Sequence, residues 1–212
     1  MTAPDLLFDG PLDARFTVVL AHGAGAPMDS PFMDAVAGGL AARGLRVARF
    51  EFPYMRARRE LGGRRPPDRP PALIECWLRV MATLGDAARL VIGGKSMGGR
   101  IASMVADDAG VAGLVCLGYP FHPSGKPDKL RVEHLEALRT PTLIVQGERD
   151  TLGRPDEVAG YALPPAIRLH WLADGDHSFK PRKASGRTEA DNWEAGAAAV
   201  AAFVDALAPP GP

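Results

Sequence analysis

Three short segments of the sequence carry side chains that together could perform nucleophilic catalysis. Ser96 lies in Gly-Lys-Ser-Met-Gly at 94–98, Asp150 ends Gly-Glu-Arg-Asp at 147–150, and His177 ends Asp-Gly-Asp-His at 174–177. A serine hydroxyl is a weak nucleophile until a neighbouring base takes its proton and a third group holds that base in place. The residue types and their order along the chain therefore predict Ser96 as nucleophile, His177 as general base and Asp150 as the acid that orients the base.

The surroundings of Ser96 strengthen this interpretation. The G-x-S-x-G pattern follows an apolar segment at 90–92 and precedes a helical pattern. In such a strand–turn–helix the serine occupies a strained turn, and its hydroxyl lies near helix amides that favour developing negative charge. The alternative is an ordinary tight turn in which Ser96 only caps the following helix.

Other histidines and acids compete for two of the three roles. His170 lies within a predicted strand and is expected to pack in the core, whereas His134 is expected at the surface. His122 follows a predicted strand and could line a pocket. Glu148 and Asp156 are the local alternatives to Asp150 as the acid.

A serine hydrolase also needs backbone donors for the oxygen that becomes negative during attack. The amide of Met97, directly after the nucleophile, is one predicted donor. The glycine-rich segment 22–25 follows the first clear strand, and its Ala24 or Gly25 amide is the predicted second donor. This segment alone would fit a simple turn equally well.

Alternating short apolar runs and helical patterns predict the scaffold. The chain is expected to form an α/β fold with a doubly wound, mostly parallel sheet of about six strands. Parallel strands place their carboxyl ends at one edge of a sheet, where ligands bind in such folds. The expected strands are 16–21, 45–50, 89–93, 111–117, 142–146 and 167–172, and the expected helices are 31–43, 72–84, 97–108 and 189–207.

Length, composition and charge favour an ordinary globular protein. The 212 residues predict a single domain over 1–208 with a flexible tail at 209–212. Lys plus Arg and Asp plus Glu both number 25, so net charge gives no reason to expect nucleic acid or an anionic membrane as partner. Cys76 and Cys116 lie in apolar segments and are expected to be buried and reduced.

Several further classes are disfavoured by missing patterns. There is no leader-like segment and no apolar run of the roughly 20 residues that a membrane span needs, so a cytoplasmic location is predicted. Neither H-E-x-x-H nor a phosphate-binding loop is present, and serine chemistry requires no metal or organic cofactor.

From 22 to 177 the motifs resemble the α/β-hydrolase superfamily, which implies a hydrolase fold with serine chemistry. More narrowly, HGAGAPMD at 22–29, FEFPYM at 50–55, RRPPDR at 64–69 and GYPFH at 118–122 resemble the small hydrolase-like family of testis-expressed and NSL-complex subunit proteins. Size and layout are also similar to dienelactone hydrolases. Those enzymes use a cysteine where this chain has Ser96, so their specific activity is not implied.

The segment after the strand that ends at Leu117 is too short for a lid domain, because only 118–128 precede the next expected helix. The resemblance therefore implies a minimal fold without a cap and a site that is open or covered only by loops. This is a poor fit to a lipase that acts on bulk lipid.

A stretch rich in arginine and proline at 53–71 is expected to be a loop beginning at the functional edge. Arg64 and Arg65 could bind a carboxylate or phosphate on the substrate, although a solvated basic loop is the alternative. His22, Tyr119 and His122 are further candidate substrate contacts, and the direction of the Lys95 side chain is left open.

The function predicted from these features is hydrolysis of a small or medium carboxylic ester, thioester or related acyl compound through an acyl-enzyme on Ser96, and the arginine-rich loop admits an anionic substrate. One alternative is a catalytically weak protein that uses the hydrolase fold for interactions. Another is a peptidase or acyltransferase with the same three residues. The sequence makes no prediction of oligomeric state.

Overall fold

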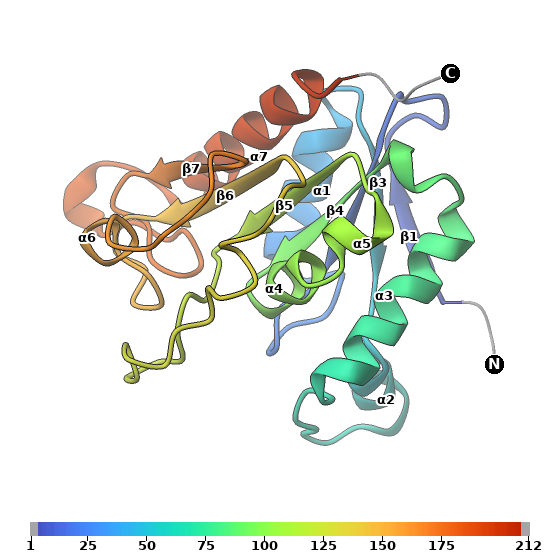
Figure 1. Cartoon of the computed structure of the whole chain (residues 1–212), viewed down its shortest axis with the longest axis horizontal. Helices are drawn as coiled ribbons and strands as arrows, with labels where there is room; N and C mark the ends of the chain where they lie inside the picture. Colours follow the sequence, from blue (N-terminus) through green and yellow to red (C-terminus); the bar gives the residue numbers. More distant parts are fainter. Residues whose placement is uncertain (1–3, 209–212) are drawn as a thin grey trace.

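A computed structural model describes residues 4–208 and shows seven strands hydrogen-bonded into one sheet, in the order β1-β3-β2-β4-β5-β6-β7 (Figure 1). Only β1 is antiparallel to its neighbour, with Leu6 opposite Phe50 of β3. The other neighbours in the sheet are parallel. The strands are β1 (Leu6–Asp9), β2 (Thr17–Ala21), β3 (Arg46–Phe50), β4 (Leu90–Lys95), β5 (Gly113–Leu117), β6 (Thr142–Gly147) and β7 (Ile167–Leu172).

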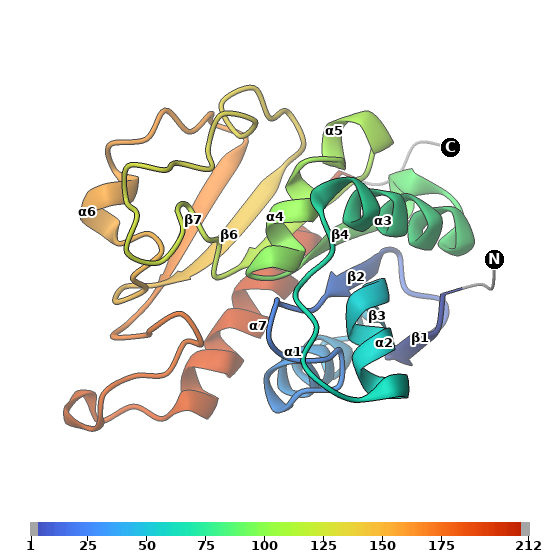
Figure 2. The same ribbon diagram turned by 90° about the horizontal axis from the view of Figure 1, so that it is seen from below.

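Helices cover both faces of this sheet (Figures 1 and 2). Helices α1 and α7 pack side by side on one face, and α3, α4 and α5 lie on the other. The described helices are α1 (Pro31–Ala41), α2 (Pro53–Leu61), α3 (Pro70–Leu84), α4 (Met97–Ser103), α5 (Ala106–Ala109), α6 (Pro155–Val158) and α7 (Glu189–Asp205).

The strands are apolar on both sides because each side packs under helices. In β2, Val18 and Leu20 belong to the hydrophobic cluster under α1 and α7, whereas Val19 and Ala21 belong to the cluster under α3 and α4. Successive residues of a strand point to opposite faces, so a strand covered on both sides must be apolar at every position. This explains the continuous apolar runs in the sequence.

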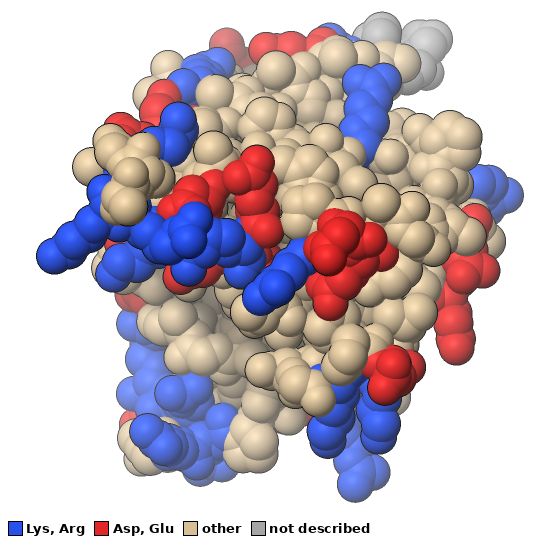
Figure 3. Space-filling view, turned by 90° about the vertical axis from the view of Figure 1, so that its left-hand side faces the viewer, with Lys and Arg blue, Asp and Glu red and all other residues tan. Residues whose placement is uncertain are grey.

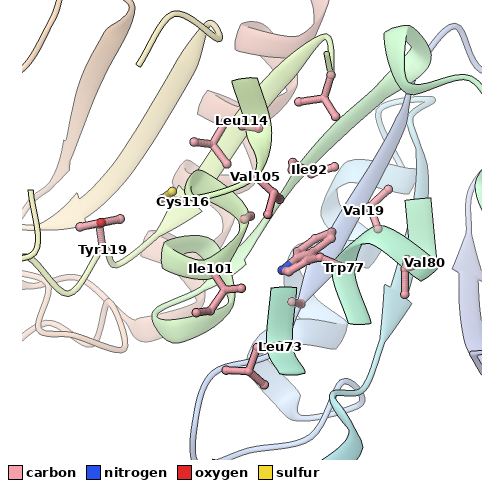
Figure 4. Packing of buried hydrophobic residues seen from close by; sticks show 14 of the residues in the cluster. Val19, Leu73, Trp77, Val80, Ile92, Ile101, Val105, Leu114, Cys116 and Tyr119 are labelled. Atoms are coloured by element: carbon pink, nitrogen blue, oxygen red, sulfur yellow. The ribbon is translucent and has the colours of Figure 1, made fainter. Parts of the chain in front are cut away.

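Trp77 of α3 anchors the second cluster (Figure 4). Its side chain is fully buried, and its ring meets that of Phe50 nearly edge-on with 4.7 Å between centroids. Large aromatic side chains supply much of the apolar area that folding buries. Trp77 therefore packs α3 against β3.

The predicted fold class is confirmed, and four details differ. The antiparallel edge strand β1 was not predicted, because it has four residues and exposes Leu7 and Phe8 rather than alternating cleanly. The segment 97–108 is two helices, α4 and α5, interrupted after Ser103.

The prediction of a loop throughout 53–71 is wrong for its first half, which forms helix α2. Pro53 fits the first turn of a helix, where its missing N–H costs nothing, and Arg56 pairs with Glu60 one turn later. Tyr54 and Met55 are buried beneath this helix. Only the remainder of the segment, before α3, is irregular.

No cap covers the sheet. The whole connection between β5 and β6, at 118–141, contains turns but no helix, so the helix expected after 128 is absent. Within residues 4–208 there is also no helix long and apolar enough to cross a membrane. The predicted tail at 209–212 lies outside the described residues.

Candidate active site

The parallel strands bring the three candidate residues to one edge of the sheet. Ser96 directly follows β4, Asp150 lies three residues after β6, and His177 lies five residues after β7. These strands belong to the run β4-β5-β6-β7, so their carboxyl ends are neighbours. Residues separated by up to 81 positions in the sequence therefore meet at this edge.

Ser96 occupies a strained turn between β4 and α4. Its φ of 50° and ψ of −112° are unusual for a residue with a side chain, and its amide donates to the Leu117 carbonyl at 2.9 Å. The turn packs so closely against β2 that a Cβ at Gly94 or Gly98 would lie 2.0 or 2.5 Å from the Ala21 carbonyl oxygen. Both flanking glycines of the motif are therefore required by the backbone that presents Ser96.

A continuous chain of hydrogen bonds links the three side chains. His177 Nε2 lies 2.9 Å from Ser96 Oγ, and His177 Nδ1 lies 2.7 Å from Asp150 Oδ2. With Nδ1 protonated and donating to the carboxylate, Nε2 is free to accept the serine proton. This arrangement can generate a nucleophilic alkoxide at Ser96 without any other group.

Asp150 is fully buried and is held by two further donors. Gln146 Nε2 donates to its Oδ2 at 2.9 Å, and the Leu152 amide donates to Oδ1 at 2.9 Å. Gln146 also bonds both the amide and the carbonyl of Tyr119, so it ties the loop after β5 to the loop after β6. A buried carboxylate with this many donors keeps a fixed orientation toward His177.

The loop that carries His177 is braced on both sides of the histidine. Asp174 forms an ion pair with Arg182 and accepts its amide. Asp176 accepts the amides of Ser178 and Lys180 at 2.8 and 3.0 Å. Since the side chain of His177 remains 31% exposed, the loop holds its backbone while leaving the ring open to the cleft.

Both predicted oxyanion donors lie beside Ser96. Met97 is the first residue of α4, so its amide has no partner within the helix. Ala24 and Gly25 line the same cleft as Ser96 and His177. The Tyr54 hydroxyl lies 3.2 and 3.1 Å from the carbonyl oxygens of Gly23 and Ala24 and pins this loop in place.

The alpha/beta hydrolase domain model matches residues 14–205, which is nearly the whole chain. The chain belongs to the alpha/beta hydrolase family. The family match agrees with the seven-stranded, capless sheet and with the position of Ser96 on it.

Solved structures show the same fold. The chain is similar to dienelactone hydrolase from Anabaena variabilis at a TM-score of 0.71 and 21% identity, with 95% of this chain and 91% of that one covered. It is similar to an α/β serine hydrolase without a lid from Xanthomonas campestris at a TM-score of 0.67 and 21% identity, covering 94% and 88%. The chain is also similar to an α/β serine hydrolase homologue from Coxiella burnetii, with a TM-score of 0.68 and 20% sequence identity. That match covers 92% of this chain and 90% of the other.

In this alpha/beta hydrolase the loop after β2 depends on His22, which corrects its predicted role as a substrate contact. His22 is fully buried, its Nδ1 lies 2.6 Å from the Gly23 carbonyl oxygen, and its Nε2 accepts the Phe52 amide at 3.1 Å. Burial lowers the pKa of His22, which matches a neutral ring with one donor and one acceptor. His22 therefore shapes the loop that bears Ala24 and Gly25 and lines no part of the cleft.

The predictions for Tyr119 and His122 are corrected for the same reason. Both side chains are buried, and neither reaches the cleft. The Tyr119 hydroxyl donates to the Arg131 carbonyl at 2.9 Å, and His122 Nδ1 lies 3.0 Å from the carbonyl oxygen of Pro123. The apolar loop after β5 folds inward, so its aromatic residues pack in the core.

Two other histidine predictions are also wrong in detail. His134 is half-buried rather than at the surface, since its Nε2 lies 2.8 Å from Ser103 Oγ. His170 is half-exposed rather than packed in the core, because β7 is the last strand of the sheet. Neither contacts the array at Ser96, so His177 is the histidine that the fold brings to the nucleophile.

The rival acids do not reach His177 either. Glu148 accepts the amide of Asp174 at 2.9 Å, and Asp156 is exposed in α6. The cysteines are free and buried as predicted. Burial raises the pKa of the Cys76 thiol to about 11 and raises that of Cys116 further, so neither provides a thiolate at neutral pH.

Two clefts open on either side of Ser96. One of about 390 Å³ is lined by Gly23, Phe32, Lys95, His177 and Ser178 among others. The other, of about 380 Å³, is lined by Met97, Arg100, Pro120, Arg131 and Leu152 among others. Figure 3 views the side of the molecule where the parallel strands end, and basic side chains gather there in separate groups around a hollowed region.

Arg64 and Arg65 are exposed and line a separate groove with Arg58 and Gly25. Gly25 also lines the 390 Å³ cleft, so this groove joins the cleft at its rim. The structure thus places the two arginines at the margin of the site rather than beside Ser96.

Sequence reasoning missed Gln146 and left the direction of Lys95 open, and the structure shows where both side chains lie. Lys95 turns into the 390 Å³ cleft, where its Nζ donates to the His177 carbonyl at 2.5 Å and lies 5.5 and 5.6 Å from the ring centroids of Phe32 and Phe179. Burial lowers the pKa of Lys95 to about 8. Gln146 had a usable signal, because it is the single amide side chain in a mostly apolar strand. The position of Lys95 beside the nucleophile was visible in the sequence, but nothing there indicated the direction of its side chain.

Proposed function

We propose that the protein is a serine hydrolase that cleaves a small or medium carboxylic ester, thioester or related acyl compound through an acyl-enzyme on Ser96. The observation that supports this most directly is the hydrogen-bonded array of Ser96, His177 and the buried Asp150. The capless fold leaves this array open to a substrate of modest size.

In the proposed reaction His177 Nε2 takes the proton of Ser96 as Oγ attacks the acyl carbon. The carbonyl electron pair moves to oxygen, and the amide of Met97, with that of Ala24 or Gly25, stabilises the resulting oxyanion. Collapse of the intermediate breaks the bond to the alcohol or thiol, which leaves with the proton from His177. Water then attacks the acyl-enzyme, passing its proton to His177, and the acid is released as Ser96 recovers its proton.

Asp150 stabilises the imidazolium formed in both half-reactions and keeps Nδ1 protonated. Its complete burial and the donors from Gln146 and Leu152 prevent it from rotating away from His177. No step in this scheme requires a metal or organic cofactor.

Two alternatives use the same observations differently. A hydrolase-fold interaction protein would need no activated serine, and it is disfavoured because the three side chains remain in hydrogen-bond register. A peptidase or acyltransferase would use the same array with another acceptor or leaving group. A cytoplasmic location, a small-molecule partner and membership of the narrower testis-expressed and NSL-complex family remain predictions from the sequence.

Labelling with a fluorophosphonate probe tests the proposal. The native protein is expected to label, and Ser96→Ala and His177→Ala are expected to abolish labelling. Ser185→Ala is a matched control, because this exposed serine lines neither cleft, and its hydroxyl bonds only backbone groups, donating to the Arg182 carbonyl and accepting the Arg187 amide. A folded native protein that does not label would favour the interaction-protein alternative.

A further inference from the structure

Arg100 and Arg131 form an uncompensated pair of positive charges in the 380 Å³ cleft. Arg100 lies in α4, one turn after Ser96, and Arg131 lies in the connection between β5 and β6. Both side chains are half-buried, and Arg100 Nε is fully buried without a hydrogen-bond partner. Among residues 4–208 neither guanidinium forms an ion pair or a hydrogen bond, and each residue lines the cleft that contains Ser96.

Three other arginines near this edge are neutralised by carboxylates, whereas Arg64 and Arg65 are exposed to solvent. Arg59 pairs with Asp29 and Glu51, Arg182 pairs with Asp174, and Arg49 pairs with Asp9 and Asp34. The described lining of this cleft includes one acid, Asp68, but its carboxylate accepts the amide of Tyr54 at 2.9 Å and forms no ion pair with any described residue. Arg100 and Arg131 are thus left to interact with a ligand.

The two guanidiniums also repel each other. Burial lowers the pKa of Arg131, and the charge of Arg100 lowers it further. Two half-buried like charges that act on each other in this way are unfavourable, and a bound anion would relieve the repulsion. The Arg131 backbone is held by two hydrogen bonds. Its amide donates to the Phe121 carbonyl at 2.8 Å, and its carbonyl accepts the Tyr119 hydroxyl. The pair therefore cannot separate by moving this part of the loop.

The position of His177 assigns the pair to one end of the substrate. A general acid must lie beside the leaving group that it protonates, and His177 lines the 390 Å³ cleft but not the 380 Å³ cleft. The leaving group then occupies the His177 side. The acyl group extends the other way, past Met97 toward Arg100 and Arg131.

We infer that the acyl group of the substrate carries a carboxylate at its far end, which Arg100 and Arg131 bind, so that the substrate is a monoester or monothioester of a dicarboxylic acid. This rests on the proposed function, because Ser96 must be the point of attack. Guanidinium groups suit this role, since they bind carboxylates through paired, charge-assisted hydrogen bonds.

Three nitrophenyl esters with acyl chains of six carbons separate the effect of charge from that of acyl-chain length, and the first two share one leaving group. 4-Nitrophenyl hydrogen adipate carries the acyl carboxylate, 4-nitrophenyl methyl adipate is its neutral counterpart, and 3-carboxy-4-nitrophenyl hexanoate carries the charge on the leaving group. Native protein is expected to show the highest kcat/KM with the first. Arg100→Gln and Arg131→Gln are each expected to lower kcat/KM for 4-nitrophenyl hydrogen adipate about 10- to 100-fold. Neither substitution is expected to change kcat/KM for 4-nitrophenyl methyl adipate more than about twofold.

Arg139→Gln is the control, because this residue is 83% exposed, pairs with Asp107 and lines neither cleft. Equal losses with all three esters would overturn the inference and indicate a structural role for the arginines. A loss confined to the ester with the charged leaving group would overturn the assignment to the acyl side.

A binding experiment makes the result independent of turnover. Calorimetric titration of Ser96→Ala with 4-nitrophenyl hydrogen adipate is expected to show binding that the double variant Ser96→Ala, Arg100→Gln loses. Binding that survives this substitution overturns the inference. Absence of labelling and turnover in the native protein overturns the proposed function instead, and the two failures are therefore distinguishable.

Discussion

Replacement of Lys95 by methionine is expected to reduce activity strongly while leaving stability almost unchanged. Lys95 Nζ donates to the carbonyl of His177, so it positions the backbone of the base from within the cleft. Methionine keeps most of the length and apolar volume of the side chain but cannot donate. Lys95 thus acts as a positioning residue for His177 in the proposed reaction.

The small stability effect follows from opposing contributions. Burial lowers the pKa of Lys95 to about 8, against an ordinary value of 10.5, and this shift corresponds to roughly 3 kcal/mol of unfavourable charge burial. The charge-assisted hydrogen bond to His177 contributes about 1.5–3 kcal/mol in the other direction. The rings of Phe32 and Phe179 add about 0.5–1 kcal/mol. The net change on replacement is therefore expected to stay within about 1 kcal/mol at pH 7.

The pH dependence has a definite sign. Below pH 8 Lys95 is protonated in both the folded and the unfolded protein, so the full cost of burying its charge is present. Between pH 8 and 10.5 the unfolded chain binds more protons at this position, so native stability gains from Lys95 as the pH rises. Lys95→Met lacks this gain, and its stability relative to the native protein is expected to fall over that window.

Activity is expected to respond quite differently. A displaced catalytic base costs one to two orders of magnitude in rate, so kcat of Lys95→Met toward a 4-nitrophenyl ester should fall about 10-fold or more, with little change in KM. Urea unfolding at pH 7 and pH 9.5 measures the stability effect. Lys183→Met, an exposed lysine of the following loop, is the control. Unchanged kcat, or a loss of more than about 2 kcal/mol at pH 7, would contradict this account.

Three further substitutions test other parts of the structure. Asp150→Asn is expected to lower kcat by about 10⁴-fold with the fold intact, as measured by ester hydrolysis and circular dichroism, because the amide favours the wrong tautomer of His177; a loss below 10-fold would count against the array. Gly98→Ala would put a Cβ 2.5 Å from the Ala21 carbonyl, so labelling of Ser96 should be lost or the thermal midpoint lowered by several degrees. Trp77→Ala should cost about 3–5 kcal/mol in chemical unfolding without altering the ester preference, and a cost under 1 kcal/mol would contradict its anchoring role.

The sequence could predict the scaffold because its signals are local and physically strict. A strand buried on both faces must be apolar throughout, and the turn at Ser96 admits only glycine at Gly94 and Gly98. Chain order and the edge of the sheet then sufficed to predict that Asp150 and His177 would lie near Ser96. The edge strand β1 and the helix α2 escaped prediction, because one is short and exposed and the other is dominated by arginine.

Side-chain direction was the part that the sequence could not supply. Position at the functional edge made His22, Tyr119 and His122 candidate contacts, yet all three turn inward and bond backbone groups of the loops that carry them. No sequence motif marked Arg100 or Arg131 as a residue of the site, because Arg100 lies in a helix and Arg131 in an irregular connection. Their shared cleft depends on packing between α4 and the loop after β5, which no local pattern records.

The buried polar residues of the site have hydrogen-bond partners within the protein, whereas the guanidinium groups of Arg100 and Arg131 have none among the described residues. This difference distinguishes residues that hold the loops in place from residues that are free to bind a substrate. His22, Gln146 and Asp150 are buried with their polar atoms bonded, so they hold loops in fixed positions and have no capacity left for a ligand. Arg100 and Arg131 line the open cleft with charges that no described residue neutralises. In the described part of the chain no cap covers this cleft, so on the proposed function selectivity for the acyl group would come from the walls of the cleft. A neutral acyl chain could enter the same open cleft, but it would form no ion pair with Arg100 and Arg131. The cleft would therefore favour an acyl group that carries a carboxylate.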